Sequence, residues 1–101
     1  PMVYAVIPQA AALPRAIALL ESLRDHGISA QMHAAGKEGL GSMKSQFKRA
    51  DASGARHALI FGDEELAQGL VALKALRDLA QPQRNLLLAE LAQWADELGA
   101  A

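Results

Sequence analysis

The chain contains no cysteine, which excludes a disulfide framework and any chemistry that depends on a thiolate. Its apolar runs are short, and none approaches the roughly 20 residues that a membrane-spanning helix needs. Aromatic side chains make up only 4% of the residues, so few platforms are present on which an unpaired base can stack. The net charge of −1 excludes a global nucleic-acid-binding signature, and any RNA-binding surface must be local.

Apolar residues make up 51% of the 101-residue chain, enough for one compact domain that buries a core without metals or disulfides. The lack of cysteine fits a reducing compartment, and we expect a cytoplasmic protein without membrane association. The sequence begins with Pro1 rather than Met, and a strand-like run follows at once. We therefore expect residues 1–101 to be a single domain cut from a longer protein.

The first third of the chain predicts a strand, a helix and a second strand. Residues 2–7 form a continuous apolar run, which is typical of a buried strand. Residues 14–26 predict a helix, because Pro14 suits its first turn and Gly27 suits the position after its end. The apolar residues at helical spacing are Leu13, Ile17, Leu20 and Leu23. Residues 28–32 alternate between apolar and polar, as in a half-exposed edge strand.

A second helix is predicted after Ser42, whose hydroxyl suits the N-cap position. We expect its apolar stripe to lie against the sheet and Gly54 to follow its end. The stripe comprises Met43, Phe47 and Ala50. Residues 55–61 are again mostly apolar and predict another strand.

The last third of the chain is harder to interpret. Gly62 and Asp63 suit a turn, and the acidic residues that follow suit the first turn of a short helix. Residues 70–76 fit a strand or a helix, and their brevity favours a strand. After a polar connection, residues 86–88 predict a short strand. A C-terminal helix is predicted from Leu91, Trp94, Ala95 and Leu98. The alternation of strands and helices implies an α/β sandwich with a largely parallel sheet.

Signals of catalysis are weak. The glycine-rich segment at residues 36–42 matches neither a P-loop nor a dinucleotide-binding fingerprint. The histidines lack metal-ligand spacing: we expect His26 to be solvated at a helix end, His33 to face water, and His57 to be a satisfied, semi-buried strand residue. The carboxylates of residues 63–65 are expected to be solvated at a helix start. We therefore predict no catalytic residue and no metal site.

Positive charge is concentrated in one segment. Five basic and two acidic residues fall between residues 36 and 57. If the predicted stripe is buried, Lys44 and Lys48 point outward together, with Gln46 and Arg49 on adjoining faces. Such cations pair with phosphates, and an amide such as Gln46 is able to read a base edge. On charge alone, however, a solvated helix face is the default interpretation.

Three segments resemble a known family: GLGSMKSQFKRAD, SGARHALIFGDEEL and GLVALKALRD, which begin at residues 39, 53 and 69. They are similar to the C-terminal anticodon-binding domain of class II aminoacyl-tRNA synthetases, and most closely to that of the histidine enzymes. In this family a glycine-rich loop leads into a Lys-x-Gln helix, and an apolar strand ends in Gly-x-x-Glu. The matching positions are Lys44, Gln46, Ala50, Asp51, Gly54, Ala55, Gly62, Glu65 and Lys74.

The resemblance implies a three-layer α/β/α sandwich around a five-stranded mixed sheet with one antiparallel strand. It implies binding of a tRNA anticodon stem-loop, that of tRNA-His, as one part of translation. The parent ligase, a homodimer built mainly by its catalytic domain, would attach histidine with ATP and Mg. This domain carries no synthetase catalytic motif, so it is expected to hold no cofactor and not to aminoacylate alone.

From the resemblance and the basic helix together we predict a set of RNA-binding residues, because the family motif marks positions and not contacts. Phosphates would be held by Lys44, Lys48 and Arg49. Bases would be read by Gln46, Glu65, Lys74, Arg77 and the backbone of the loop that contains Gly39 and Gly41. The chain departs from the family pattern after Lys74, where the acidic residue of Lys-Asp-Leu is missing, and in residues 77–91, which lack the usual polar strand.

Two other functions are open at this point. A synthetase-like accessory domain would keep the fold and bind a protein, but the basic helix argues against a neutralised RNA face. A small-molecule α/β enzyme is the weakest alternative, because the sequence offers no convergent set of polar residues.

Overall fold

Strands and helices alternate through the first half of the chain, as the sequence predicts. The computed structural model describes residues 2–32, 42–78 and 80–100. The elements are β1 (Val3–Val6), η1 (Ala10–Ala12), α1 (Leu13–Asp25), β2 (Ala30–Met32), α2 (Met43–Ala52), β3 (His57–Ile60), α3 (Asp63–Ala67), β4 (Leu70–Ala75), β5 (Arg84–Leu87), η2 (Leu88–Glu90) and α4 (Leu91–Ala100).

The strands form one mixed sheet in the order β2-β1-β3-β4-β5. β1 is parallel to both β2 and β3, whereas β4 is antiparallel to β3 and to β5. Among the described strands, β4 alone therefore runs against the others. This confirms the predicted five-stranded mixed sheet, with β2 at one edge.

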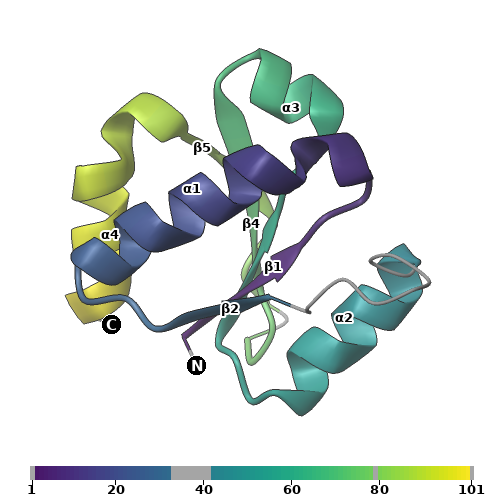
Figure 1. Ribbon diagram of the computed structural model, residues 1–101. Helices are drawn as coiled ribbons and strands as arrows, with labels where there is room; N and C mark the ends of the chain where they lie inside the picture. Colours follow the sequence, from purple (N-terminus) through teal and green to yellow (C-terminus); the bar gives the residue numbers. More distant parts are fainter. Residues whose placement is uncertain (1, 33–41, 79, 101) are drawn as a thin grey trace.

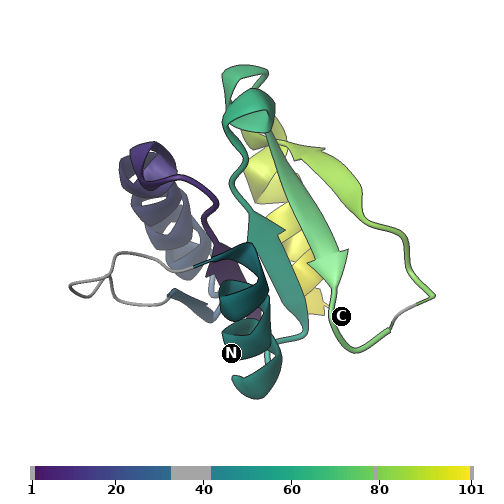
Figure 2. The ribbon, with the colours of Figure 1, turned by 90° about the vertical axis from the view of Figure 1, so that its right-hand side faces the viewer.

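The helices cover the two faces of the sheet. Odd-numbered residues of β1, such as Val3 and Ala5, pack in a core with residues of α1 and α4. On the other face, Val6 and Tyr4 lie in small clusters with Phe47 and Ala50 of α2. Figure 1 shows α1 and α4 side by side with α2 apart from them, and Figure 2 shows α4 behind β3 and β4. The fold is thus a three-layer α/β/α sandwich.

The helix ends follow the predicted local rules. The Ser42 hydroxyl accepts a hydrogen bond from the Ser45 backbone N–H at 3.1 Å, so it caps α2. Gly27 and Gly54, which follow α1 and α2, have φ values of +81° and +82°. This left-handed conformation is one that glycine adopts without the steric cost of a Cβ.

The predicted apolar stripes are wrong at one residue in each helix. In α1, Ile17 is 43% exposed, whereas Ala16, Leu20 and Leu23 are buried. The buried face is rotated toward Ala16, because a small side chain lets the helix approach the sheet closely. In α2, Met43 is 39% exposed, and the polar residue Gln46 is buried instead.

The last strand lies earlier than predicted. β5 spans Arg84–Leu87 instead of residues 86–88, and Leu88 already belongs to η2. Only Leu86 of this edge strand is buried, and the neighbouring Leu87 is exposed, so the run of apolar residues does not mark where the strand begins and ends. The ambiguous segment before it is indeed the strand β4.

The difference between Leu20 and Ile17 gives a test of the core. We expect Leu20→Ala to lower the free energy of unfolding by about 2 to 5 kcal/mol, because Leu20 is 1% exposed and its removal leaves a cavity. Ile17→Ala, the matched control on the same helix, should cost about 1 kcal/mol or less. Urea unfolding followed by circular dichroism measures both. Equal losses would contradict the observed face of α1.

Candidate nucleic-acid interface

Helix α2 is fixed to the end of β1 by one buried side chain, Gln46, which is 2% exposed. Its Oε1 accepts a hydrogen bond from the Ile7 backbone N–H at 2.6 Å, and its Nε2 donates to the Ile7 carbonyl at 2.8 Å. Ile7 directly follows β1, where the backbone leaves the sheet. The Gln46 amide therefore pairs both the backbone N–H and the carbonyl of Ile7, a buried residue that lies outside the paired part of β1.

The expected outward orientation of Gln46 is wrong. Periodicity assigned the inward face of α2 to apolar residues, but the buried residues of this helix are Gln46 and Ala50. The reason is that the helix packs over the end of a strand, where backbone donors and acceptors need partners more than apolar contact. Gln46 thus positions α2 and presents no amide to a ligand.

Three basic residues of α2 do face solvent as predicted: Lys44, Lys48 and Arg49 are exposed. Arg49 lies close enough to the sheet to influence Tyr4 on β1. Burial raises the pKa of the Tyr4 hydroxyl, and the positive charge of Arg49 partly lowers it again. The exposed side of α2 is therefore a cationic surface held directly above one face of the sheet.

Two basic residues from β4 and the segment after it join α2. The Nζ atom of Lys74 lies 4.9 Å from the centroid of the Phe47 ring, a cation–π distance. Arg77 donates from Nη1 to the Asp51 carboxylate at 2.9 Å and from Nη2 to the Asp51 carbonyl at 2.6 Å. It thereby satisfies a carbonyl in the last turn of α2. We call the surface formed by Lys44, Lys48, Arg49, Lys74 and Arg77 the α2 face.

Other predicted site residues lie elsewhere. Glu65 belongs to α3, which Figures 1 and 2 place apart from α2, and its carboxylate lies against Gly62. Gly39 and Gly41, like Lys37 and His33, lie outside the residues that the structure describes. The structure therefore brings together the basic residues of the predicted set, whereas Glu65 lies apart from them.

The histidines differ in their surroundings. His26 is exposed at the end of α1, as expected, with Nδ1 at 2.8 Å from the Ser22 carbonyl. His57 is half-buried, but its Nδ1 is buried without a hydrogen-bond partner among the described residues. Burial lowers the pKa of His57, and the charges of Arg84 and Arg56 lower it further. The expectation of a satisfied histidine is therefore wrong at this atom.

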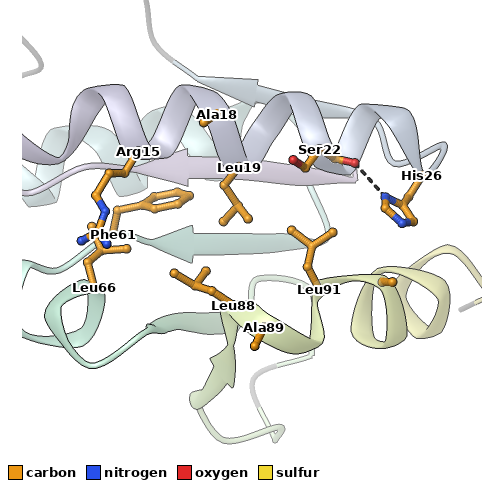
Figure 3. Close-up of a pocket in the computed structure, with 11 residues that line it drawn as sticks. Arg15, Ala18, Leu19, Ser22, His26, Phe61, Leu66, Leu88, Ala89 and Leu91 are labelled. Atoms are coloured by element: carbon orange, nitrogen blue, oxygen red, sulfur yellow. Dashed lines mark hydrogen bonds between the residues drawn. The ribbon is translucent and has the colours of Figure 1, made fainter.

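A groove of about 500 Å³ lies on the opposite side of the sheet, between α1 and the segment formed by η2 and α4. Figure 3 shows Leu19 pointing toward Leu88 and Leu91, with Phe61 and Leu66 at one end. Its lining is mostly apolar and brings no set of acid, base and nucleophile together. In the described ranges, no three His, Cys, Asp or Glu residues gather as a metal site, and no helix is suited to cross a membrane.

The fold and the α2 face define a small α/β/α domain with one exposed basic helix, and comparison with known proteins identifies its family. The family model described as the anticodon binding domain matches residues 2–98, so the chain belongs to this family. A histidine–tRNA ligase from Acidovorax ebreus is 58% identical over 97 residues, covering 94% of this chain and 22% of the ligase. A histidine–tRNA ligase from Methylobacillus flagellatus is 48% identical over 83% of this chain and 19% of the ligase. The chain thus spans about a fifth of these relatives.

Solved structures agree with this assignment. Apo histidyl-tRNA synthetase from S. aureus matches with a TM-score of 0.77 at 26% identity, covering 92% of this chain and 22% of the synthetase. The histidyl-tRNA synthetase from Nostoc sp. matches with a TM-score of 0.78, also at 26% identity, over 96% and 22%. The RNA binding domain of threonyl-tRNA synthetase from Cryptosporidium parvum shares the fold, with a TM-score of 0.82 at 14% identity over 96% and 23%.

The Gln46 contact can be tested by its effect on stability. Gln46→Leu keeps a side chain of similar length but leaves the Ile7 N–H and carbonyl buried without this partner, so we expect a loss of about 2 to 5 kcal/mol in the free energy of unfolding. Urea unfolding measures this loss, and amide hydrogen exchange at Ile7 should become faster.

The matched control is Gln93→Leu, because Gln93 is an exposed glutamine of another helix, α4. It should change stability by about 0.5 kcal/mol or less. A Gln46 variant as stable as this control would show that the buried amide does not hold α2 in place.

Proposed function

We propose that this domain binds the anticodon stem-loop of tRNA-His as the C-terminal domain of a histidine–tRNA ligase. The observation that carries the proposal is the α2 face, where five basic side chains from α2, β4 and the following segment lie on one side of the sheet. Membership of the anticodon-binding family and the ligase relatives support the RNA partner.

Within the α2 face, the side chains suit two different tasks. Lys44, Lys48 and Arg49 are exposed on one helix, and their flexible cationic ends suit contacts with successive phosphates of the RNA backbone. Such contacts give affinity that falls steeply with salt concentration, because each one releases condensed counterions. We propose these three residues as phosphate contacts.

Lys74 and Arg77 suit a more specific task, because both are held in place. Lys74 is half-buried against Phe47, and Arg77 is fixed by two hydrogen bonds to Asp51. A positioned cation donates to base acceptors at a defined site, as sequence-specific recognition of unstacked RNA bases requires. We propose Lys74 and Arg77 as base-reading residues, together with Glu65 and the backbone at Gly39 and Gly41. Gln46 is no longer in this set.

The rest of the enzyme would carry out the chemistry. We propose that the catalytic domain of the parent ligase binds ATP and Mg, forms the homodimer and works in the cytoplasm, with this domain contributing tRNA binding alone. A protein-binding accessory role is not favoured, because the α2 face is basic and the relatives are ligases.

The phosphate contacts are tested by removing two charges from α2. We expect Lys44→Gln/Lys48→Gln to weaken binding of the tRNA-His anticodon stem-loop about tenfold, since two phosphate contacts are lost. The slope of log affinity against log salt should fall by about 1 to 2. Fluorescence anisotropy at several salt concentrations measures both quantities.

A charge-matched control is Arg15→Gln/Arg24→Gln, which removes two cations from α1 on the other side of the sheet. This variant should bind the stem-loop within about twofold of the unchanged chain, since α1 makes no proposed phosphate contact. Equal weakening by the two double variants would mean that only net charge matters and that the α2 face is not the binding site.

A further inference from the structure

A row of four residues crosses the sheet from the α2 face to the edge strand β2. The strand register pairs Gln31 of β2 with Tyr4 of β1, and Tyr4 with Ala58 of β3. Ala58 is in turn paired with Lys74 of β4. Residues paired in register on neighbouring strands point to the same face of a sheet and lie about 5 Å apart. Because Lys74 belongs to the α2 face, Gln31 and Tyr4 extend that face toward β2.

Side-chain contacts agree on which side of the sheet this row occupies. Tyr4 packs in one cluster with Ala50 of α2, and Lys74 lies over the ring of Phe47 from the same helix. The positive charge of Arg49 also acts on the Tyr4 hydroxyl. The row therefore lies on the side of α2, next to its basic residues.

The amide of Gln31 is available to a ligand. Gln31 is exposed, so α2 does not cover the sheet as far as this position of β2. Its side chain makes no hydrogen bond with any residue that the structure describes. A primary amide offers donors and an acceptor side by side, which suits it to pair with the edge of a base. The sequence assigned this task to Gln46, whose amide instead bonds Ile7.

The hydroxyl of Tyr4 is the second available group. Tyr4 is 5% exposed, and its hydroxyl has no hydrogen-bond partner among the described residues. Within the described ranges, the buried side-chain polar atom that lacks a partner is Nδ1 of His57 and not this hydroxyl. The hydroxyl oxygen of Tyr4 therefore retains contact with solvent, and a phenol both donates and accepts hydrogen bonds.

We propose that the Gln31 amide and the Tyr4 hydroxyl together read the edge of one unstacked RNA base, which lies over β1 and β2 beside the cations of α2. This inference rests on the proposed function and adds two uncharged groups to it. Phosphate contacts position an RNA without reading its sequence, whereas hydrogen bonds to base edges distinguish one base from another. Lys44, Lys48 and Arg49 hold the backbone in this arrangement, and Gln31 and Tyr4 contribute specificity.

Two variants remove these polar groups and keep the shapes of the side chains. Gln31→Met removes the amide, and Tyr4→Phe removes the hydroxyl alone. Each should weaken binding of the tRNA-His anticodon stem-loop about threefold to tenfold, which is the loss expected for a neutral hydrogen bond. The slope of log affinity against log salt should not change, because neither group is charged. Fluorescence anisotropy at several salt concentrations measures both quantities.

A matched control and a stability measurement accompany the two variants. Gln93→Met, which changes an exposed glutamine of α4, should bind the stem-loop within about twofold of the unmodified chain. The urea midpoints of Gln31→Met and Tyr4→Phe should equal that of the unmodified chain, so that a loss of affinity is not a loss of folding.

Stem-loops that lack one base of the anticodon loop at a time identify the base that is read. At one position, removing the base should weaken binding to the unmodified chain but cause no further loss with Gln31→Met, because the two changes delete the same contact. A merely structural role of Gln31 would instead lower the affinity for every stem-loop by the same factor, and that result overturns base reading.

The remaining outcomes separate this inference from the proposed function. If Gln31→Met and Tyr4→Phe bind like the unmodified chain while Lys44→Gln/Lys48→Gln loses affinity, the proposed function stands and this inference fails. If the unmodified chain binds no stem-loop, the proposed function fails and the inference fails with it.

Discussion

The two hydrogen bonds between Gln46 and Ile7 determine where the basic side chains of α2 lie. Without them the helix would cover the end of β1 with apolar contacts from Phe47 and Ala50 alone, and the backbone groups of Ile7 would lose these partners. Because hydrogen bonds are directional and apolar contacts are not, the amide fixes the position of α2 along and around its axis. The orientation of Lys44 and Lys48 relative to the sheet follows from that contact.

A second contact extends the cationic surface beyond one helix. Arg77 reaches from the segment after β4 to Asp51 at the other end of α2, so the helix is held at its N-terminal half by Gln46 and at its C-terminal turn by Arg77. Lys74 lies between them, over Phe47. The α2 face thus combines basic side chains from a helix, a strand and the segment after that strand.

The sequence predicted elements well where burial is continuous and poorly where it is partial. Residues 2–7 and 55–61 were recognisable because both faces of those strands are covered, whereas β5 exposes every residue except Leu86. For the site, helical periodicity is enough to predict that Lys44 and Lys48 are exposed. It does not predict that Gln46 is buried, because periodicity treats an amide as polar and takes no account of the backbone groups of Ile7, which lie 39 residues away in the sequence.

RNA binding on the α2 face, and not on the apolar groove between α1 and α4, can be tested by mapping amide chemical-shift changes while the tRNA-His anticodon stem-loop is added. We expect the largest changes at Lys48, Arg49 and Lys74, with little change at Leu19 and Leu91. Changes concentrated at Leu19 and Leu91, with the α2 residues unaffected, would contradict it.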